Sequence, residues 1–164
     1  MIIDLEEIKR ISKRNEDKNW RFRSYLKMQD DKKIDNLVKP IYQSVIKEIN
    51  CLECGNCCRV MSPLILDEDI RKLGLELNLS AEEIIEKYTV KDEFNEMGFK
   101  EIPCVFLNGN ECQVYNNRPE DCKSFPHIHK KGFTTRLIGM IHNSEICPIV
   151  FNVFEELKIQ CKFR

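Results

Sequence analysis

The sequence contains no run of apolar residues that approaches the roughly 18 needed to cross a membrane. It also lacks the apolar segment of a signal peptide, because Asp4, Glu6 and Glu7 lie where that segment would be. We therefore expect a cytoplasmic protein that does not enter a membrane.

Neither sign of charge is in marked excess. The net charge is −1 at pH 7, and no compact run of lysine and arginine occurs. Such a chain has no overall field to draw it to nucleic acid or to an anionic membrane. We expect neither partner, whereas a protein partner and the oligomeric state stay open.

The common nucleotide-binding and protease motifs are missing as well. There is no Walker loop, no GxGxxG and no HExxH, and we find no internal repeat, linker or low-complexity segment. The 164 residues are enough for one domain with its own core. Whether the protein is an enzyme is left open by these absences.

Cysteine, by contrast, is abundant. The chain has nine cysteines, an odd number that cannot pair completely within one chain. The reducing cytosol also disfavours structural disulfides, so we favour metal ligation. The eight candidate ligands are Cys51, Cys54, Cys57, Cys58, Cys104, Cys112, Cys122 and Cys147. The ninth, Cys161, is either a further thiol of this group or a small buried apolar residue.

The densest stretch is CLECGNCC, residues 51–58. Its CxxCxxC spacing is the one with which bacterial ferredoxins hold three corners of a 4Fe–4S cluster, and the fourth ligand there is a cysteine followed by proline. Cys147-Pro148 offers such a pair. Cys54-Gly55 equally resembles a zinc knuckle. The spacing predicts a metal site and leaves iron–sulfur and zinc open.

Cys57 and Cys58 are adjacent, and neighbouring side chains in a helix or strand point in different directions. One tetrahedral ion would not easily take both sulfurs. Either the two serve different metal atoms, or Cys58 is a buried thiol beside the site. The pair suits a multinuclear centre better than a single ion, so we favour an iron–sulfur cluster over zinc.

Hydrophobic periodicity indicates helices through the first fifty residues. In the clearest run, from Ile34 to Ile49, the apolar residues fall at helical spacing on both sides of Pro40, which predicts one kinked helix. Helices are also predicted over 66–78, capped by Asp67, and over 79–88. In the second of these, Ser80 and Glu83 would form a capping box.

The remaining part mixes helix and strand. A hairpin is predicted around Asn108-Gly109, one helical turn after Pro119, a strand over 132–141 and a C-terminal helix just after Pro148. We therefore predict an α+β fold, a helix-rich single domain with a small β-hairpin or sheet around a cysteine-ligated metal site. Residues 1–49 would form an N-terminal helical segment packed on the core, and residues 50–164 the metal-binding domain, as one structural domain overall.

Two further features could contribute to a site. The sequence HIH would place His127 and His129 on one face of a strand, where they either chelate a metal or remain solvated. Arg118 either donates hydrogen bonds to metal-bound sulfurs or bridges a turn and the core.

Three blocks of the sequence, CLECGNCCR, PCVFLNGNECQVYNNRPEDCKSFP and ICP, resemble the YkgJ-like CxxCxxCC family of zinc- or iron-chelating domains. The likeness covers about residues 50–150, with Val114 and Lys123 as mild departures from the usual Ile and Arg. The positions that carry it are Cys51, Cys54, Cys57, Cys58, Pro103, Cys104, Phe106, Leu107, Cys112, Tyr115, Arg118, Pro119, Cys122, Phe125, Pro126 and Cys147.

The resemblance implies that the eight cysteines, without Cys161, form the metal-binding set. Sequences related to this family include flagellin lysine-N-methylases and iron–sulfur oxidoreductases. Our expectation is a metal-binding protein that holds an iron–sulfur cluster in a redox, sensing or metal-handling role. The alternatives are a zinc-stabilised binding module and a protein-modifying enzyme.

Overall fold

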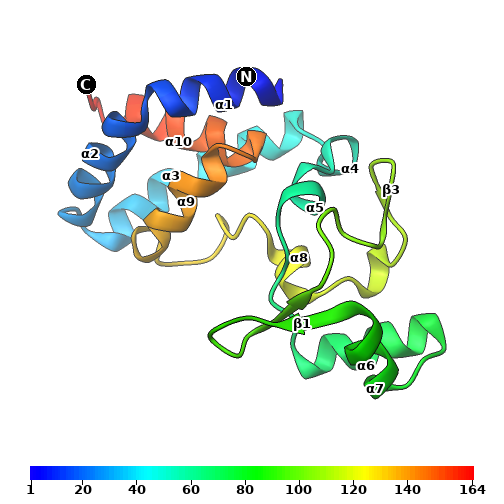
Figure 1. Cartoon of the computed structure of the whole chain (residues 1–164). Helices are drawn as coiled ribbons and strands as arrows, with labels where there is room; N and C mark the ends of the chain where they lie inside the picture. Colours follow the sequence, from blue (N-terminus) through cyan, green and yellow to red (C-terminus); the bar gives the residue numbers. More distant parts are fainter. The chain divides into compact units, whose positions relative to one another are not determined.

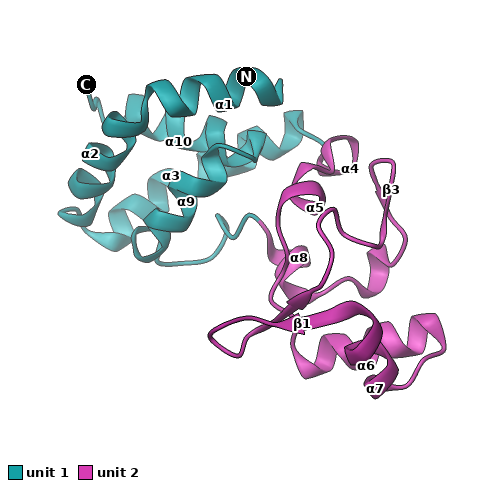
Figure 2. Cartoon of the chain, viewed as in Figure 1, with its two compact units in different colours: residues 1–50, 126–164 teal, residues 51–125 magenta.

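The computed structural model describes residues 1–164 (Figure 1). The chain forms two compact units (Figure 2). Unit 1 consists of residues 1–50 and 126–164, and unit 2 of residues 51–125. The structure confirms the helix-rich α+β class, with two small antiparallel sheets among many helices.

Unit 1 is helical. Its elements are α1 (Leu5–Arg14), α2 (Glu16–Lys27), α3 (Asp31–Glu48), the 3-10 helix η2 (Phe133–Arg136), α9 (Leu137–Ser144) and α10 (Pro148–Gln160). Helix α10 packs against α1 and α3 as well as against its neighbour α9, so the last helix lies on helices from the first fifty residues. The C-terminal helix predicted near Pro148 is confirmed and begins at that proline.

Helix α3 confirms the predicted apolar run. Its buried residues are Ile34, Val38, Ile41 and Val45. Pro40 is exposed, and the helix continues through it to Glu48. The missing proline N–H therefore lies on the solvent side, away from the face that stabilises the helix.

The strand predicted over 132–141 is wrong, because these residues form η2 and the first part of α9. The buried residues Leu137, Met140, Ile141 and Ser144 follow helical spacing. A contact from α3 fixes where the turn begins. The Asp35 carboxylate accepts hydrogen bonds from the backbone N–H of Gly132 at 2.8 Å and of Phe133 at 2.9 Å.

Unit 2 alternates short helices with two hairpins. Its helices are α4 (Cys51–Cys54), α5 (Asn56–Val60), α6 (Asp67–Leu77), α7 (Ala81–Tyr88), η1 (Tyr115–Asn117) and α8 (Glu120–Ser124). Strands β1 (Thr89–Lys91) and β2 (Met97–Phe99) pair antiparallel, as do β3 (Leu107–Asn108) and β4 (Glu111–Cys112). The predicted β3–β4 hairpin is confirmed, whereas the β1–β2 hairpin was missed because its strands are too short to show an alternation.

One apolar core holds unit 2 together. It consists of Ile65, Ile70, Leu73, Ile84, Phe99, Phe106 and Val114. Helices α6 and α7 pack on each other, and the predicted capping box of α7 is confirmed. The Ser80 N–H donates to Glu83 Oε2 at 2.7 Å, and the Glu83 N–H donates to Ser80 Oγ at 3.2 Å.

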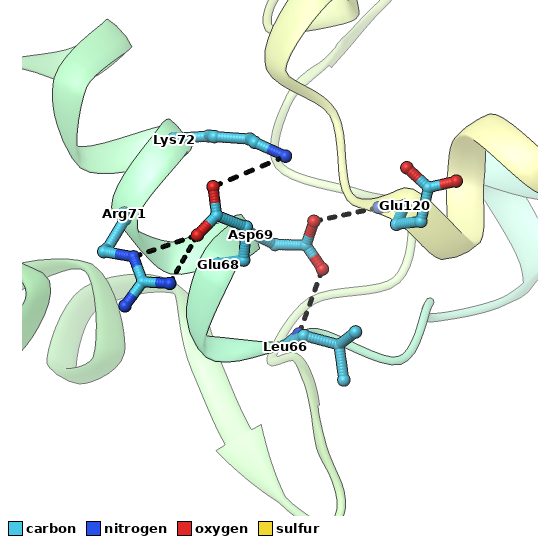
Figure 3. A network of polar contacts seen from close by, with 6 residues as sticks. All are labelled: Leu66, Glu68, Asp69, Arg71, Lys72 and Glu120. Carbon is cyan, nitrogen blue, oxygen red and sulfur yellow. Dashed lines mark hydrogen bonds and ion pairs between the residues drawn. The ribbon is translucent and has the colours of Figure 1, made fainter.

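The cap predicted for α6 at Asp67 is wrong. The helix begins at Asp67, and its capping carboxylate belongs to Asp69 (Figure 3). Asp69 Oδ2 accepts from the Leu66 N–H at 3.0 Å, and Oδ1 accepts from the Glu120 N–H at 3.0 Å. The same side chain thus caps α6 and holds the start of α8.

No helix of the structure combines the length and the apolar character that a membrane-spanning segment needs.

Candidate metal site

The CxxCxxCC motif forms two short helices, α4 and α5, and we call residues 51–58 the first cysteine loop. Gly55 joins the two helices in the left-handed region, at φ +58°, where an L side chain is strained. A Cβ there would also lie 3.0 Å from the Arg59 guanidinium and 3.4 Å from the Asn110 backbone. Gly55 is therefore required by backbone conformation and by a close approach. Cys51 is exposed, and the other three cysteines of the loop are partly buried.

The β3–β4 hairpin carries the next two cysteines to this loop. Cys104 precedes β3 and Cys112 ends β4, and both pack against the apolar core of unit 2. The Cys104 N–H donates to the Cys58 carbonyl at 2.8 Å, which joins the two segments directly. Gly109, at φ +61°, and Asn110 form the two-residue turn of the hairpin.

Cys122 comes from a third segment. It lies on α8, the helical turn predicted after Pro119, and the Asp69–Glu120 hydrogen bond holds the first residue of that helix. Burial, followed by the neighbouring thiols of Cys58 and Cys104, raises the pKa of Cys122 to about 12.

Several thiols of these segments lie close enough to shift one another's pKa. Burial raises the pKa of both Cys104 and Cys112, and the thiol of Cys58 raises each further. Cys122 is coupled to all three of these residues. The loop, the hairpin and α8 therefore bring four thiols together, and we call Cys58, Cys104, Cys112 and Cys122 the inner thiols.

Cys58 differs from the others in the group. A hydrogen bond from the Cys57 thiol outweighs burial, and with the charges of Arg59 and Arg118 it lowers the pKa of Cys58 to about 6. The adjacent cysteines thus interact with each other. The hydrogen bond from Cys57 favours the thiolate form of Cys58.

Cys51 and Cys54 form a second pair of neighbours. Although Cys51 has an exposed surface, desolvation by the surrounding chain and then the thiol of Cys54 raise its pKa, while the charge of Arg118 lowers it. Arg118 acts here through its charge, which also favours the thiolates of Cys58 and Cys112. Its guanidinium lies 3.7 Å from the centre of the Tyr115 ring and donates to the Tyr115 carbonyl.

The last two cysteines belong to unit 1. Cys147 is the N-cap residue of α10 and is 7% exposed. Cys161 is the C-cap residue of the same helix and is partly buried. Burial raises the pKa of the Cys161 thiol.

The strand predicted for HIH is wrong. Residues 127–129 form an irregular turn, with His127 at φ +61° and Ile128 buried between the two histidines. His129 is exposed, and its ring centre lies 6.3 Å from that of Tyr42. The two imidazoles therefore do not share the face of a strand.

The donor set suits zinc and iron. Thiolates are the soft ligands that both metals take in cysteine-rich sites, and unit 2 alone supplies seven of them. As the side chains stand, no three cysteine, histidine or carboxylate groups are close enough to hold an ion. The residues fit zinc or iron in kind and in number. The fold already places the inner thiols in the same neighbourhood.

Sequence reasoning missed three residues that shape this site, Asp69, Arg59 and Asn110. Asp69 stands three residues after the N-cap of α6, a position where acids reach back to the cap, so a local signal existed. Arg59 and Asn110 are 51 residues apart and bond each other, which no local pattern reveals.

No solved protein structure matches this chain. The family model CxxCxxCC, described as a putative zinc- or iron-chelating domain, matches residues 50–147. This range begins one residue before Cys51 and ends on Cys147, so it contains all eight predicted ligands and leaves Cys161 outside. Zinc and iron, the metals expected from the sequence, are those the family description names. Because the match covers more than half of the chain, the chain belongs to the CxxCxxCC family.

Proposed function

We propose that the protein holds an iron–sulfur cluster on cysteine thiolates and serves a redox, sensing or metal-handling role. The ligands would come from Cys51, Cys54, Cys57, Cys58, Cys104, Cys112, Cys122 and Cys147. A bound cluster would supply one-electron redox chemistry. The chain's own residues would provide the thiolates, the nearby positive charge and the burial that limits access of water.

The observation that carries this proposal is the position of Cys58. It accepts a hydrogen bond from Cys57 within its own loop, and its charge raises the pKa of thiols in the hairpin and in α8. One cysteine is thus the neighbour of at least four others. More sulfurs gather around it than one tetrahedral ion can take, which favours a centre with several metal atoms.

Positive charge beside the thiols supports the same conclusion. Arg59 and Arg118 both favour the thiolate form of Cys58. A centre with several thiolate ligands carries net negative charge, and nearby guanidinium groups stabilise that charge. The arginines would therefore help to hold the cluster and to set its potential.

The test is to purify the protein without oxygen and to count iron, zinc and acid-labile sulfide per chain. Iron with matching sulfide and a visible absorption band of the cluster supports the proposal. A colourless protein without iron contradicts it. Serine variants of Cys58 and Cys122 should each reduce the iron content, while the anaerobic wild type serves as the reference.

Zinc is the second candidate, and the inner thiols favour it. They number four and come from three segments, and four is the ligand count of a structural zinc site with cysteine ligands. Zinc bound there would join the loop, the hairpin and α8 and so contribute to folding directly. Stoichiometric zinc without sulfide, with loss of the folded state on chelation, would support this alternative.

We also propose that the protein works in the reducing cytoplasm. All nine cysteines are thiols rather than disulfides in the structure. Thiolate ligands must stay reduced to bind metal, and an oxidising compartment would convert accessible thiols to disulfides. Thiol counting on protein taken directly from cells tests this, and extensive disulfide formation would contradict it.

A further inference from the structure

Arg59 directly follows the last cysteine of the first cysteine loop and spans two segments. Its Nη1 donates to the carbonyl of Cys54 at 2.8 Å. Its Nη2 donates to the carbonyl of Gly109 at 2.8 Å and to the Asn110 side-chain oxygen. One guanidinium thus bonds the middle of the loop and the turn of the β3–β4 hairpin at the same time.

Asn110 makes the reciprocal contact. Its Nδ2 donates to the carbonyl of Glu53 at 2.7 Å, while its oxygen accepts from Arg59. The loop therefore reaches the turn through Arg59, and the turn reaches the loop through Asn110. Most of these bonds end on backbone carbonyls, so they fix the path of the chain between the cysteines without using a sulfur.

The close approach at Gly55 fits the same arrangement. Both the Arg59 guanidinium and the Asn110 backbone lie where a Cβ of residue 55 would meet them. The left-handed residue between α4 and α5 is therefore the point at which the loop touches the hairpin turn. On the other side of the contact, the Cys104 N–H donates to the Cys58 carbonyl at 2.8 Å.

We propose that Arg59 and Asn110 form a latch that holds the first cysteine loop against the β3–β4 turn and so positions its thiols beside those of Cys104 and Cys112 before metal binds. This inference rests on the proposed metal-binding function and adds two positioning residues to it. Holding donors near one another in advance removes part of the ordering cost of binding, so the latch raises metal affinity without supplying a ligand.

The role requires the shape of the guanidinium as well as its charge. Two nitrogens of one planar guanidinium donate three hydrogen bonds in different directions. A lysine ammonium on a flexible side chain cannot reproduce this arrangement. Arg118 is the matched comparison. Its charge acts on the same thiols, but its guanidinium donates to Tyr115 and this bond does not join loop to turn.

The test titrates the reduced, metal-free full chain with Co²⁺, whose absorption reports the number of thiolate ligands. Arg59→Lys, Arg59→Met and Asn110→Ala should each lower the Co²⁺ affinity by about tenfold or more, the scale of outer-sphere substitutions at metal sites. The spectrum at saturation should match the wild type, because no ligand is lost. Arg118→Met should lower the affinity by less than Arg59→Met does.

Two results would overturn the latch. If Arg59→Lys binds Co²⁺ as tightly as the wild type, charge alone accounts for Arg59. If Arg118→Met weakens binding as much as Arg59→Met, the link to the hairpin turn contributes nothing. A variant that fails to fold does not decide the matter alone, because Asn110→Ala tests the same link from the other segment.

Amide hydrogen exchange of the metal-free protein separates this inference from the proposed function. The Cys104 N–H, which bonds the Cys58 carbonyl, should exchange faster in Arg59→Lys and in Asn110→Ala than in Arg118→Met. If the wild type takes up neither cobalt, zinc nor iron, the proposed metal-binding function is contradicted. The exchange rates of the variants still test the latch in that case. Equal exchange in all variants would overturn the latch even if the protein binds metal.

Discussion

Asp69 accepts a hydrogen bond at 3.0 Å from the backbone N–H of Glu120, which lies 51 positions further along the chain (Figure 3). The carboxylate is 2% exposed and caps its own helix through the Leu66 N–H. The neighbouring ion pairs of Glu68 with Arg71 and Lys72 lie on the exposed side of the same helix. Of these acids, Asp69 is the one that joins the α6–α7 hairpin to the helix of Cys122.

We expect Asp69→Ala to lower the free energy of unfolding by about 3 kcal/mol, because two partly buried N–H groups lose a charged acceptor. Urea denaturation of the metal-free protein measures this change. Asp67→Ala is the matched control, since Asp67 is exposed at the start of the same helix, and it should change stability by about 0.5 kcal/mol or less. Equal losses in the two variants would contradict the role assigned to Asp69.

Cys58 should be the most reactive thiol of the metal-free protein near neutral pH. Its pKa is lowered to about 6, so its thiolate dominates at pH 7, whereas the pKa of Cys122, raised to about 12, keeps that residue a protonated thiol. Alkylation by iodoacetamide, mapped by mass spectrometry from mildly acidic to mildly alkaline pH, should give a rate at Cys58 that is half-maximal near pH 6.

The Cys57→Ala variant is the control for this reactivity, because it removes the hydrogen bond that lowers the Cys58 pKa most. Its alkylation profile should move to higher pH. Bound metal should protect Cys58 in the wild type. A profile that is the same with and without Cys57 would show that the hydrogen bond does not set the thiolate.

Lys158 provides a pH test within unit 1. Its ammonium is 3% exposed and donates to Asn19 Oδ1 and to Glu155 Oε1, each at 2.5 Å. Burial lowers its pKa from 10.5, although Glu155 opposes the shift. The unfolded chain therefore binds the proton more tightly than the folded one, and stability rises with pH between the lowered pKa and 10.5.

We expect this rise in the wild type and its absence in Lys158→Met. The measurement is the free energy of unfolding at a series of alkaline pH values, taken as the difference between the two proteins. Lys9→Met, changed at an exposed position of α1, should keep the rise. Parallel curves for the wild type and Lys158→Met would mean that burial of Lys158 does not penalise its charge.

Sequence periodicity predicted α3 because its apolar residues are spaced for one buried face, which the packed helix uses directly. The capping box of Ser80 and Glu83 was predictable for a similar reason, since both partners are three residues apart. The same reasoning gave a wrong prediction for residues 132–141. Their apolar residues suit a strand or a helix, and the contact that holds the start of η2 comes from Asp35, almost a hundred positions earlier.

The candidate site likewise combines features that the local sequence predicts with features that depend on distant contacts. Spacing alone indicated that Cys51, Cys54 and Cys57 act together, and the neighbouring helices α4 and α5 carry them. That Cys58 lies near Cys122 depends on the Asp69–Glu120 hydrogen bond and on the apolar core beneath the hairpin. Such contacts join residues far apart in the sequence, so a motif predicts candidate ligands without showing how they are divided among metal atoms.

Cys147 and Cys161 allow a direct test of how far the ligand set extends. Both flank α10, at its N-cap and C-cap, and the family match ends on Cys147. We expect Cys147→Ser to lower the metal content of protein purified without oxygen, and Cys161→Ser to leave it unchanged. The serine keeps the size of the side chain but is a poor ligand for zinc or iron.

The stability of these two variants in the metal-free state completes the comparison. Cys147 is 7% exposed, so burying a hydroxyl there costs stability even where no metal is involved. If Cys147→Ser is less stable without metal and yet retains the full metal content, then Cys147 acts as a small apolar residue at the start of α10. The ligand set would then lie within residues 51–125, with Cys58 and its neighbouring thiols as its centre.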